Sequence, residues 1–187
     1  MTKHIFIVGP GSVGKSTTGS LLATKLGYAF RDVDSQFCER IGLIGDYIKE
    51  KSYRDYCKKN ADLFDTLVAE AGEPTVFALP SGFLVHEKAP EIAESNKKLL
   101  KKLGLTILLL PSQTAKEGVD TVVQRHLSRN YIDTDAKIER ERFISRFPKY
   151  LSYGGNIQIF SVAAPEKIAD EMLVRIKEWQ SNIKATL

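Results

Sequence analysis

Residues 9–16 read GPGSVGKS, between the apolar run Ile5–Val8 and the amphipathic stretch Lys15–Leu26. The spacing satisfies G-x-x-x-x-G-K-[ST] at every position, and the flanking segments predict a strand before the loop and a helix after it. Glycines allow such a loop to curl so that its N–H groups point at phosphate oxygens, and the helix N-terminus adds the positive end of its dipole. The sequence therefore predicts a phosphate-binding loop, with an accidental glycine turn as the disfavoured alternative.

The side chains of this loop predict its ligands. Lys15 would neutralise the β- and γ-phosphates of a nucleoside triphosphate, and the Ser16 hydroxyl would be an oxygen ligand of Mg²⁺. We therefore expect ATP and Mg²⁺, although the loop alone does not separate a kinase from a GTPase, a motor or a nucleotide-binding regulator. Guanine-specificity motifs of the Asn-Lys-x-Asp type are absent from the sequence. The predicted nucleotide-binding residues are Gly11, Ser12, Val13, Gly14, Lys15, Ser16 and Thr17.

Apolar segments of strand length alternate with helical patterns along the rest of the chain. Strands are predicted at 5–8, 28–31, 75–79, 105–110 and 157–160, and helices at 15–26, 53–71, 89–103, 136–151 and 166–184. Strands that alternate with helices and are apolar throughout are typical of a parallel sheet covered on both faces. We therefore predict a three-layer α/β P-loop fold in which helices flank a central five-stranded parallel sheet. Ligands bind at the carboxyl ends of the strands in such folds.

The size and charge of the chain narrow the function further. Its 187 residues are predicted to form a single domain, 1–187, which fits small-molecule kinases and leaves no room for the added domains of motors. The formal net charge is +4, and no arginine-rich arm or zinc-finger spacing occurs, so we expect no nucleic-acid partner. The apolar runs are much shorter than the roughly 20 residues that span a bilayer, so we expect no membrane association and a cytoplasmic location. We also expect a monomer.

The second predicted strand ends in Phe30-Arg31-Asp32-Val33-Asp34, a segment that resembles the Phe-x-Asp-x-Asp of the shikimate kinase family. The resemblance implies that Asp32 contributes to the Mg²⁺ site, and that Asp34 binds the acceptor hydroxyl and is a candidate base. Two carboxylates two residues apart at the end of a strand also point to one side, beside the phosphate loop. The alternative for Asp34 is the cap of a helix that begins near Ser35.

Two arginines match the residues with which this family binds the carboxylate of its acceptor. Tyr53-Arg54 stands in the place of a Phe-Arg pair, and residues 146–150, RFPKY, match Arg-x-Pro-x-Tyr. A guanidinium pairs with a carboxylate through two parallel hydrogen bonds, which suits Arg54 and Arg146 to this role. A solvated helix face is the alternative for Arg54, and an ion pair with Glu141 is the alternative for Arg146.

One departure from the family pattern concerns the acceptor pocket. Where the family has Gly-Gly-Gly after its third strand, this chain has LPSGF at residues 79–83, in which Gly82 is the one glycine. Pro80 has no N–H, and Ser81 and Phe83 carry side chains where the close approach of a ligand calls for glycine. The segment is therefore expected to alter or block the acceptor pocket.

The other departure is the lid, which we place at about 112–135. Instead of the Arg-Pro-Leu-Leu of the family, this chain has RHLSRNY at residues 125–131. Arg129 is the candidate catalytic arginine that covers the phosphates, as mobile arginines do in phosphoryl transfer, and Arg125 is its rival.

These features predict an ATP-dependent phosphotransferase that moves the γ-phosphate of ATP to a hydroxyl of a small anionic acceptor, with shikimate as the best single candidate. Helices at about 34–72 would bind the acceptor. The alternatives are a kinase of a sugar acid or a nucleoside monophosphate, and a nucleotide-binding regulatory protein without turnover. The predicted site comprises the catalytic residues Lys15, Asp34 and Arg129, the acceptor-binding residues Asp34, Arg54, Gly82 and Arg146, and the metal ligands Ser16 and Asp32.

Overall fold

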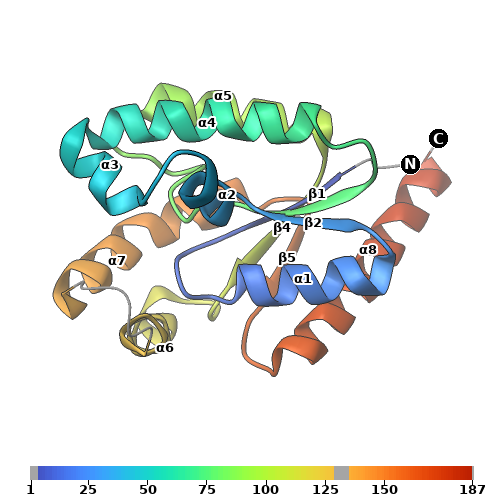
Figure 1. Ribbon diagram of the computed structural model, residues 1–187. Helices are drawn as coiled ribbons and strands as arrows, with labels where there is room; N and C mark the ends of the chain where they lie inside the picture. The colour runs from blue at the N-terminus through green and yellow to red at the C-terminus, as the bar shows by residue number, and fades with distance from the viewer. Residues whose placement is uncertain (1–3, 129–134, 187) are drawn as a thin grey trace.

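The computed structural model describes residues 4–128 and 135–186 of the chain. At its centre is a five-stranded parallel sheet with the strand order β2-β3-β1-β4-β5 (Figure 1). The predicted five-stranded parallel sheet is confirmed, and the strand that leads into the phosphate loop is its central one. The strands are β1 (His4–Val8), β2 (Ala29–Asp32), β3 (Thr75–Ala78), β4 (Gly104–Leu110) and β5 (Ile157–Phe160).

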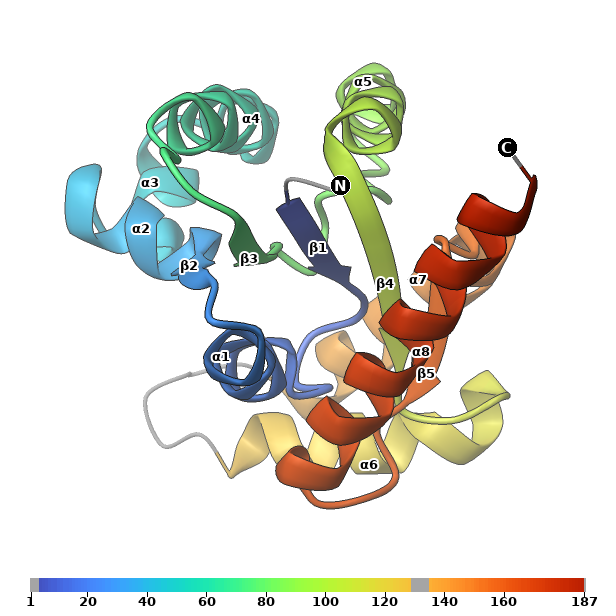
Figure 2. The same cartoon turned by 90° about the vertical axis from the view of Figure 1, so that its right-hand side faces the viewer.

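Helices cover both faces of this sheet, which confirms the predicted three layers. In the described residues they are α1 (Lys15–Leu26), α2 (Val33–Arg40), α3 (Ile44–Glu50), α4 (Tyr53–Ala69), α5 (Pro90–Leu103), α6 (Ala115–Leu127), α7 (Ala136–Tyr153) and α8 (Pro165–Thr186). Figure 2 shows α4 and α5 over one face of the sheet and α1 and α8 over the other. Within the described parts of the chain, no helix combines the length and apolar character needed to cross a membrane.

The helix boundaries agree best with the predictions where the ends are set locally. Helix α1 has the predicted bounds, and Gly27 ends it in the left-handed region with φ +67°. By contrast, α3 and α6 were not predicted as separate helices, and α6 lies in the segment assigned to the lid, whereas α2 corresponds to the helix expected to begin near Ser35. Helix α2 begins directly after β2 because the Asp32 side chain accepts a hydrogen bond from the Ser35 N–H at 3.0 Å. The cap is therefore Asp32, and the alternative that Asp34 caps this helix is wrong.

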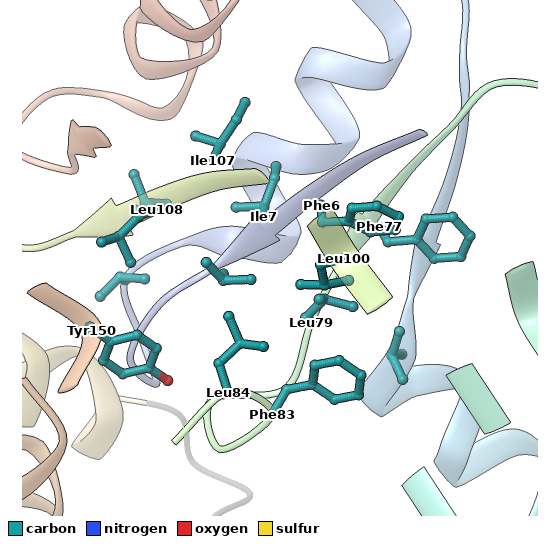
Figure 3. Packing of buried hydrophobic residues seen from close by; sticks show 14 of the residues in the cluster. Phe6, Ile7, Phe77, Leu79, Phe83, Leu84, Leu100, Ile107, Leu108 and Tyr150 are labelled. Carbon is teal, nitrogen blue, oxygen red and sulfur yellow. The ribbon is translucent and has the colours of Figure 1, made fainter. Parts of the chain in front are cut away.

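The part of the core between the sheet and α4 holds a group of phenylalanines. Phe6 of β1 and Phe77 of β3 stack with ring centroids 5.6 Å apart (Figure 3). Phe64 of α4 meets Phe83 edge-on with ring centroids 5.0 Å apart. Each of these side chains is at most 1% exposed. Burial of a side chain of this size contributes about 2 kcal/mol, so Phe83 anchors the segment that follows β3. This anchoring places residues 79–83 beside the phosphate loop.

Candidate functional site

The phosphate loop connects β1 to α1 and bends sharply on the way. Gly14, which precedes α1, has φ +95°, and Ser12 has φ +58°, a left-handed conformation that is uncommon for a residue with a Cβ. At Gly9 a Cβ would lie 2.1 Å from the carbonyl oxygen of Leu109, so this exit from β1 requires glycine. No described side chain caps the N-terminus of α1, whose N–H groups therefore remain suited to an anion.

Lys15 and Ser16 begin α1 and turn toward the loop and the end of β2. The Lys15 ammonium donates to the carbonyl oxygens of Gly9 at 3.0 Å and of Pro10 at 2.7 Å. The Ser16 hydroxyl donates to the Asp32 carboxylate. Mg²⁺ prefers such hard oxygen ligands, and proteins commonly hold it through one or two of them together with substrate phosphates. Ser16 and Asp32 therefore fit the predicted metal site.

A cavity of about 180 Å³ joins the phosphate loop to both aspartates. The structure thus brings the predicted phosphate-binding residues and the predicted base together. Val13 and Thr17, which were also predicted to bind the nucleotide, do not line this cavity. The Val13 side chain is buried in the core, and Thr17 is exposed. The cavity is lined by Gly11, Ser12, Gly14, Lys15 and Ser16 of the loop, by Asp32, Asp34, Leu79 and Ser81, and by His126, Glu139 and Arg142 of α6 and α7.

Asp34 lies in the first turn of α2, just beyond the strand, and its Oδ1 accepts a hydrogen bond from the Tyr56 hydroxyl at 3.4 Å. Burial, together with the neighbouring Asp32, raises the pKa of Asp34 from 3.8 to about 6. Lys15 and the Tyr56 hydrogen bond act in the opposite direction and offset part of this rise. A carboxyl group with a pKa near the operating pH is suited to act as a general base.

Helix α4 contacts two of the predicted acceptor-binding residues, Asp34 and Arg146, through two tyrosines three residues apart. Tyr56 bonds to Asp34, as described, while the Tyr53 hydroxyl accepts a hydrogen bond from Arg146 Nη2 of α7 at 3.1 Å. The same hydroxyl lies 3.0 Å from Nδ1 of His86, which is buried. Arg146 also lines a small cavity with residues 10, 11 and 81, so its guanidinium lies beside the phosphate loop. Arg146 does not line the larger cavity with Lys15 and Asp34, but it lines this adjoining one, so its role in acceptor binding stays a prediction.

Arg54 lies elsewhere on α4. Its guanidinium pairs with Glu91 of α5 at 2.6 Å and donates to the Lys88 carbonyl oxygen at 3.3 Å, and 61% of its side chain is exposed. Successive residues of a helix point about 100° apart, so Tyr53 and Arg54 face different directions. Arg54 does not line the cavity of the phosphate loop.

Within the segment 79–83, Leu79 and Ser81 line the cavity of the phosphate loop, whereas Phe83 does not. Phe83 points into the core, so the expectation that it stands where the acceptor approaches is wrong. Gly82 is buried against a wall, because a Cβ there would lie 2.8 Å from the His86 ring and 3.0 Å from the Tyr53 hydroxyl. Ser81 does line the cavity, and its carbonyl oxygen accepts a hydrogen bond from Tyr150. Gly82 therefore allows Tyr53 and His86 to pack closely against the backbone.

Of the two predicted lid arginines, the structure describes Arg125 alone. Arg129 lies outside the described residues. Arg125, near the end of α6, donates to the Ser161 carbonyl oxygen at 3.1 Å and to the Ser161 hydroxyl at 3.3 Å. These bonds tie α6 to the loop that follows β5.

Three residues of the cavity were not predicted from the sequence: His126, Glu139 and Arg142. Nδ1 of His126 lies 3.3 Å from the Ser12 hydroxyl, and its Nε2 lies 4.0 Å from the Glu139 carboxylate, which also pairs with Arg142. Glu139, Arg142 and Arg146 are spaced i, i+3 and i+7, which places them on one face of α7. That spacing was the available signal, since it aligns both residues with the arginine already predicted.

The chain is similar in sequence to known proteins of one family. A family model described as shikimate kinase matches residues 11–116. The shikimate kinase of Nitratidesulfovibrio vulgaris is 30% identical over 129 residues, which cover 68% of this chain and 64% of that protein. The shikimate kinase of Psychrobacter sp. is 34% identical over 105 residues, 56% of this chain and 54% of that protein. The chain thus spans less than two thirds of the length of these curated relatives.

A solved structure extends the likeness to nearly the whole fold. The shikimate kinase of Acinetobacter baumannii in complex with shikimate has a TM-score of 0.71 and 21% identity, and it covers 95% of this chain and 94% of that one. This likeness concerns the fold, whereas the family model matches the sequence itself over more than half of the chain. Through that match, the chain belongs to the shikimate kinase family.

Proposed function

We propose that this protein transfers the γ-phosphate of ATP to a hydroxyl group of a small anionic acceptor, and that the acceptor is shikimate. The observation that carries the proposal is that one cavity is lined both by the phosphate loop with Lys15 and by Asp34, whose pKa is raised to about 6. Such a transfer needs phosphates that are held and neutralised and an acceptor hydroxyl that is oriented toward them, which the loop and Asp34 can supply. Membership of the shikimate kinase family supports the choice of acceptor.

On the donor side, the loop N–H groups, the N-terminus of α1 and Lys15 bind and neutralise the phosphates. Lys15 already lies over its own loop, so a small movement of its ammonium group from the carbonyl oxygens to the phosphates is sufficient. Ser16 and Asp32 would hold Mg²⁺, which when bound neutralises charge on the β- and γ-phosphates. These residues thereby favour departure of the ADP group.

On the acceptor side, Asp34 orients the hydroxyl group and takes its proton. The hydroxyl oxygen forms a bond to the γ-phosphorus, the bond from that phosphorus to the β,γ-bridging oxygen breaks, and ADP leaves with the bonding electrons. Arg146, oriented by the Tyr53 hydroxyl, binds the acceptor carboxylate. Arg146 and Asp34 therefore hold two ends of one acceptor, which supplies the positioning on which phosphoryl transfer depends.

A coupled assay of ADP release with Mg²⁺, ATP and shikimate tests the proposal. We expect turnover that Asp34→Asn and Arg146→Ala both cripple, with ATP binding retained in calorimetry. Turnover with gluconate or a nucleoside monophosphate but not with shikimate would keep the phosphotransferase and replace the acceptor. ATP binding without ADP release on any of these acceptors would instead support the nucleotide-binding regulatory protein.

A further inference from the structure

Helix α7 presents a second arginine to the phosphate loop. Arg142 lines the cavity of about 180 Å³ together with Lys15 and Asp34, and it also lines the adjoining small cavity with Arg146. It therefore stands between the donor side and the acceptor side of the site. Arg140, two residues earlier on the same helix, pairs instead with Asp120 of α6 and does not line either cavity.

A buried carboxylate fixes Arg142 in this position. The Glu139 side chain is 9% exposed, whereas that of Arg142 is 46% exposed, and the two form an ion pair. Glu139 is also 4.0 Å from His126, whose other ring nitrogen lies 3.3 Å from the Ser12 hydroxyl of the phosphate loop. The carboxylate thus connects Arg142 to the loop. A guanidinium has five N–H donors in a planar fork, so pairing through one edge leaves it able to donate to a phosphate.

The balance of charges in the cavity gives Arg142 a role in phosphate binding. Three carboxylic residues line it, Asp32, Asp34 and Glu139, against two cations, Lys15 and Arg142. Without Arg142, Lys15 would be the one cation among the described residues of the cavity, beside three acidic side chains and a triphosphate. The Glu139 carboxylate would then repel the phosphates. The ion pair with Arg142 offsets this repulsion, because it holds a cation beside the phosphate loop.

We propose that Arg142 is a catalytic residue that donates hydrogen bonds to the γ-phosphate of bound ATP and stabilises its charge during transfer, and that Glu139 and His126 are its positioning residues. The proposal rests on the nucleotide-binding part of the proposed function and not on the identity of the acceptor. The arginine that contacts the transferred phosphate then comes from helix α7, and it already lies in the cavity of the phosphate loop.

Calorimetry with the β,γ-imido analogue of ATP and with ADP, both with Mg²⁺, tests the contact. A hydrogen bond to a charged group changes affinity by about tenfold or more, so Arg142→Ala should weaken binding of the triphosphate analogue by at least about tenfold. Binding of ADP, which lacks the γ-phosphate, should change less than about twofold. Arg140→Ala, from the same helix, should leave both affinities unchanged. Equal losses for the two nucleotides, or no loss for either, would overturn the proposal.

A double variant separates a phosphate contact from mere neutralisation of Glu139. Glu139→Gln combined with Arg142→Ala removes both charges of the pair, so the net charge of the cavity is that of the wild type. If Arg142 contacts the γ-phosphate, the double variant keeps the selective loss of the triphosphate analogue. Recovery of wild-type affinity in the double variant would show that Arg142 is a counter-ion only. If the wild type binds Mg²⁺-ATP but does not phosphorylate shikimate, the acceptor assignment fails and the affinities still test the role of Arg142. If the wild type does not bind Mg²⁺-ATP, both proposals are overturned.

Discussion

The phosphate loop and the acceptor side of the cavity are built in different ways. In the loop, the contacts of Lys15 reach residues five and six positions away, and Ser16 bonds to a strand end 16 positions away. On the acceptor side, Arg146 bonds to a tyrosine 93 positions away, and that tyrosine bonds to a histidine 33 positions further along. A change at Lys15 should therefore lower turnover with little effect on the fold. A change at Arg146 or Tyr53 should instead act on the affinity for the acceptor, because these side chains are held by residues distant in the sequence.

The largest effect is expected at Lys15. Lys15→Met removes the cation that neutralises the phosphates, and we expect kcat in the coupled ADP assay to fall by about a thousandfold or more. The thermal unfolding midpoint should change little, because the Lys15 ammonium donates its hydrogen bonds to Gly9 and Pro10 within its own loop. Lys25→Met, further along α1 and paired with Asp170, is the matched control. Full activity of Lys15→Met would refute the assignment of the site.

Asp34→Asn should have the next largest effect on turnover. General bases contribute about a hundredfold to ten-thousandfold, and we expect a loss of kcat in this range. Because the base must be ionised, kcat/KM of the wild type should rise as the pH rises through about 6 and level off above it. Asp46→Asn, at an exposed position of α3, serves as the control. A wild-type profile that is flat from pH 5 to 8 would contradict the role of Asp34 as the base.

The same substitution should stabilise the protein. Between pH 3.8 and about 6, native Asp34 holds a proton that the unfolded chain has lost, so the free energy of unfolding falls as the pH rises through this window. At pH 7 the buried charge costs at most about 3 kcal/mol, and Asp34→Asn removes that cost. Denaturant unfolding should show the variant to be more stable than the wild type at pH 7 and equal to it below pH 4. A variant that is less stable at pH 7 would contradict the pKa shift.

Arg146→Ala should act on the acceptor and not on the nucleotide. Loss of a charge-assisted pair with a carboxylate should raise KM for shikimate by about tenfold to a hundredfold, while KM for ATP changes little. Arg140→Ala on the same helix is the control. If KM for ATP rises as much as KM for shikimate, Arg146 belongs to the donor side and the comparison of the two sides fails.

Tyr53→Phe restores the phenylalanine that the family pattern carries and removes one hydroxyl group. Because this hydroxyl orients Arg146, we expect KM for shikimate to rise by about threefold to tenfold with kcat nearly unchanged. The double variant with Arg146→Ala should have nearly the same KM as Arg146→Ala alone, because the effects of mutating two residues in contact are not additive. Tyr153→Phe, whose hydroxyl bonds to Thr106, is the control. Fully additive effects would show that Tyr53 acts independently of Arg146.

Arg54→Ala should have the smallest effect. Its exposed ion pair with Glu91 contributes less than about 1 kcal/mol, and we expect KM for shikimate to change less than about threefold. The same steady-state assay measures it beside Arg146→Ala. A rise in KM as large as that of Arg146→Ala would show that Arg54 leaves Glu91 to bind the acceptor, as the family resemblance implies.

Particular residues show how far the sequence could predict this site. Asp32 and Ser16 were placed together from the end of one strand and the start of one helix, and the structure joins them by a hydrogen bond. Phe83 was misplaced because a single phenylalanine in a turn does not reveal whether it faces a ligand or the core. Helix α3 was not predicted because it has 7 residues, which is too short for a clear apolar period to stand out.

The sequence by itself determined the phosphate loop, the helix that follows it and the alternation of strands and helices. These depend on interactions between near neighbours, such as the loop glycines and the left-handed turn at Gly27, which a local pattern can encode. The tertiary structure alone decided that Tyr53 meets Arg146, that Asp32 and not Asp34 caps α2, and that Glu139 holds Arg142 beside the loop. Such pairings depend on how α4, α6 and α7 pack around the sheet, and many packings are compatible with the same local pattern.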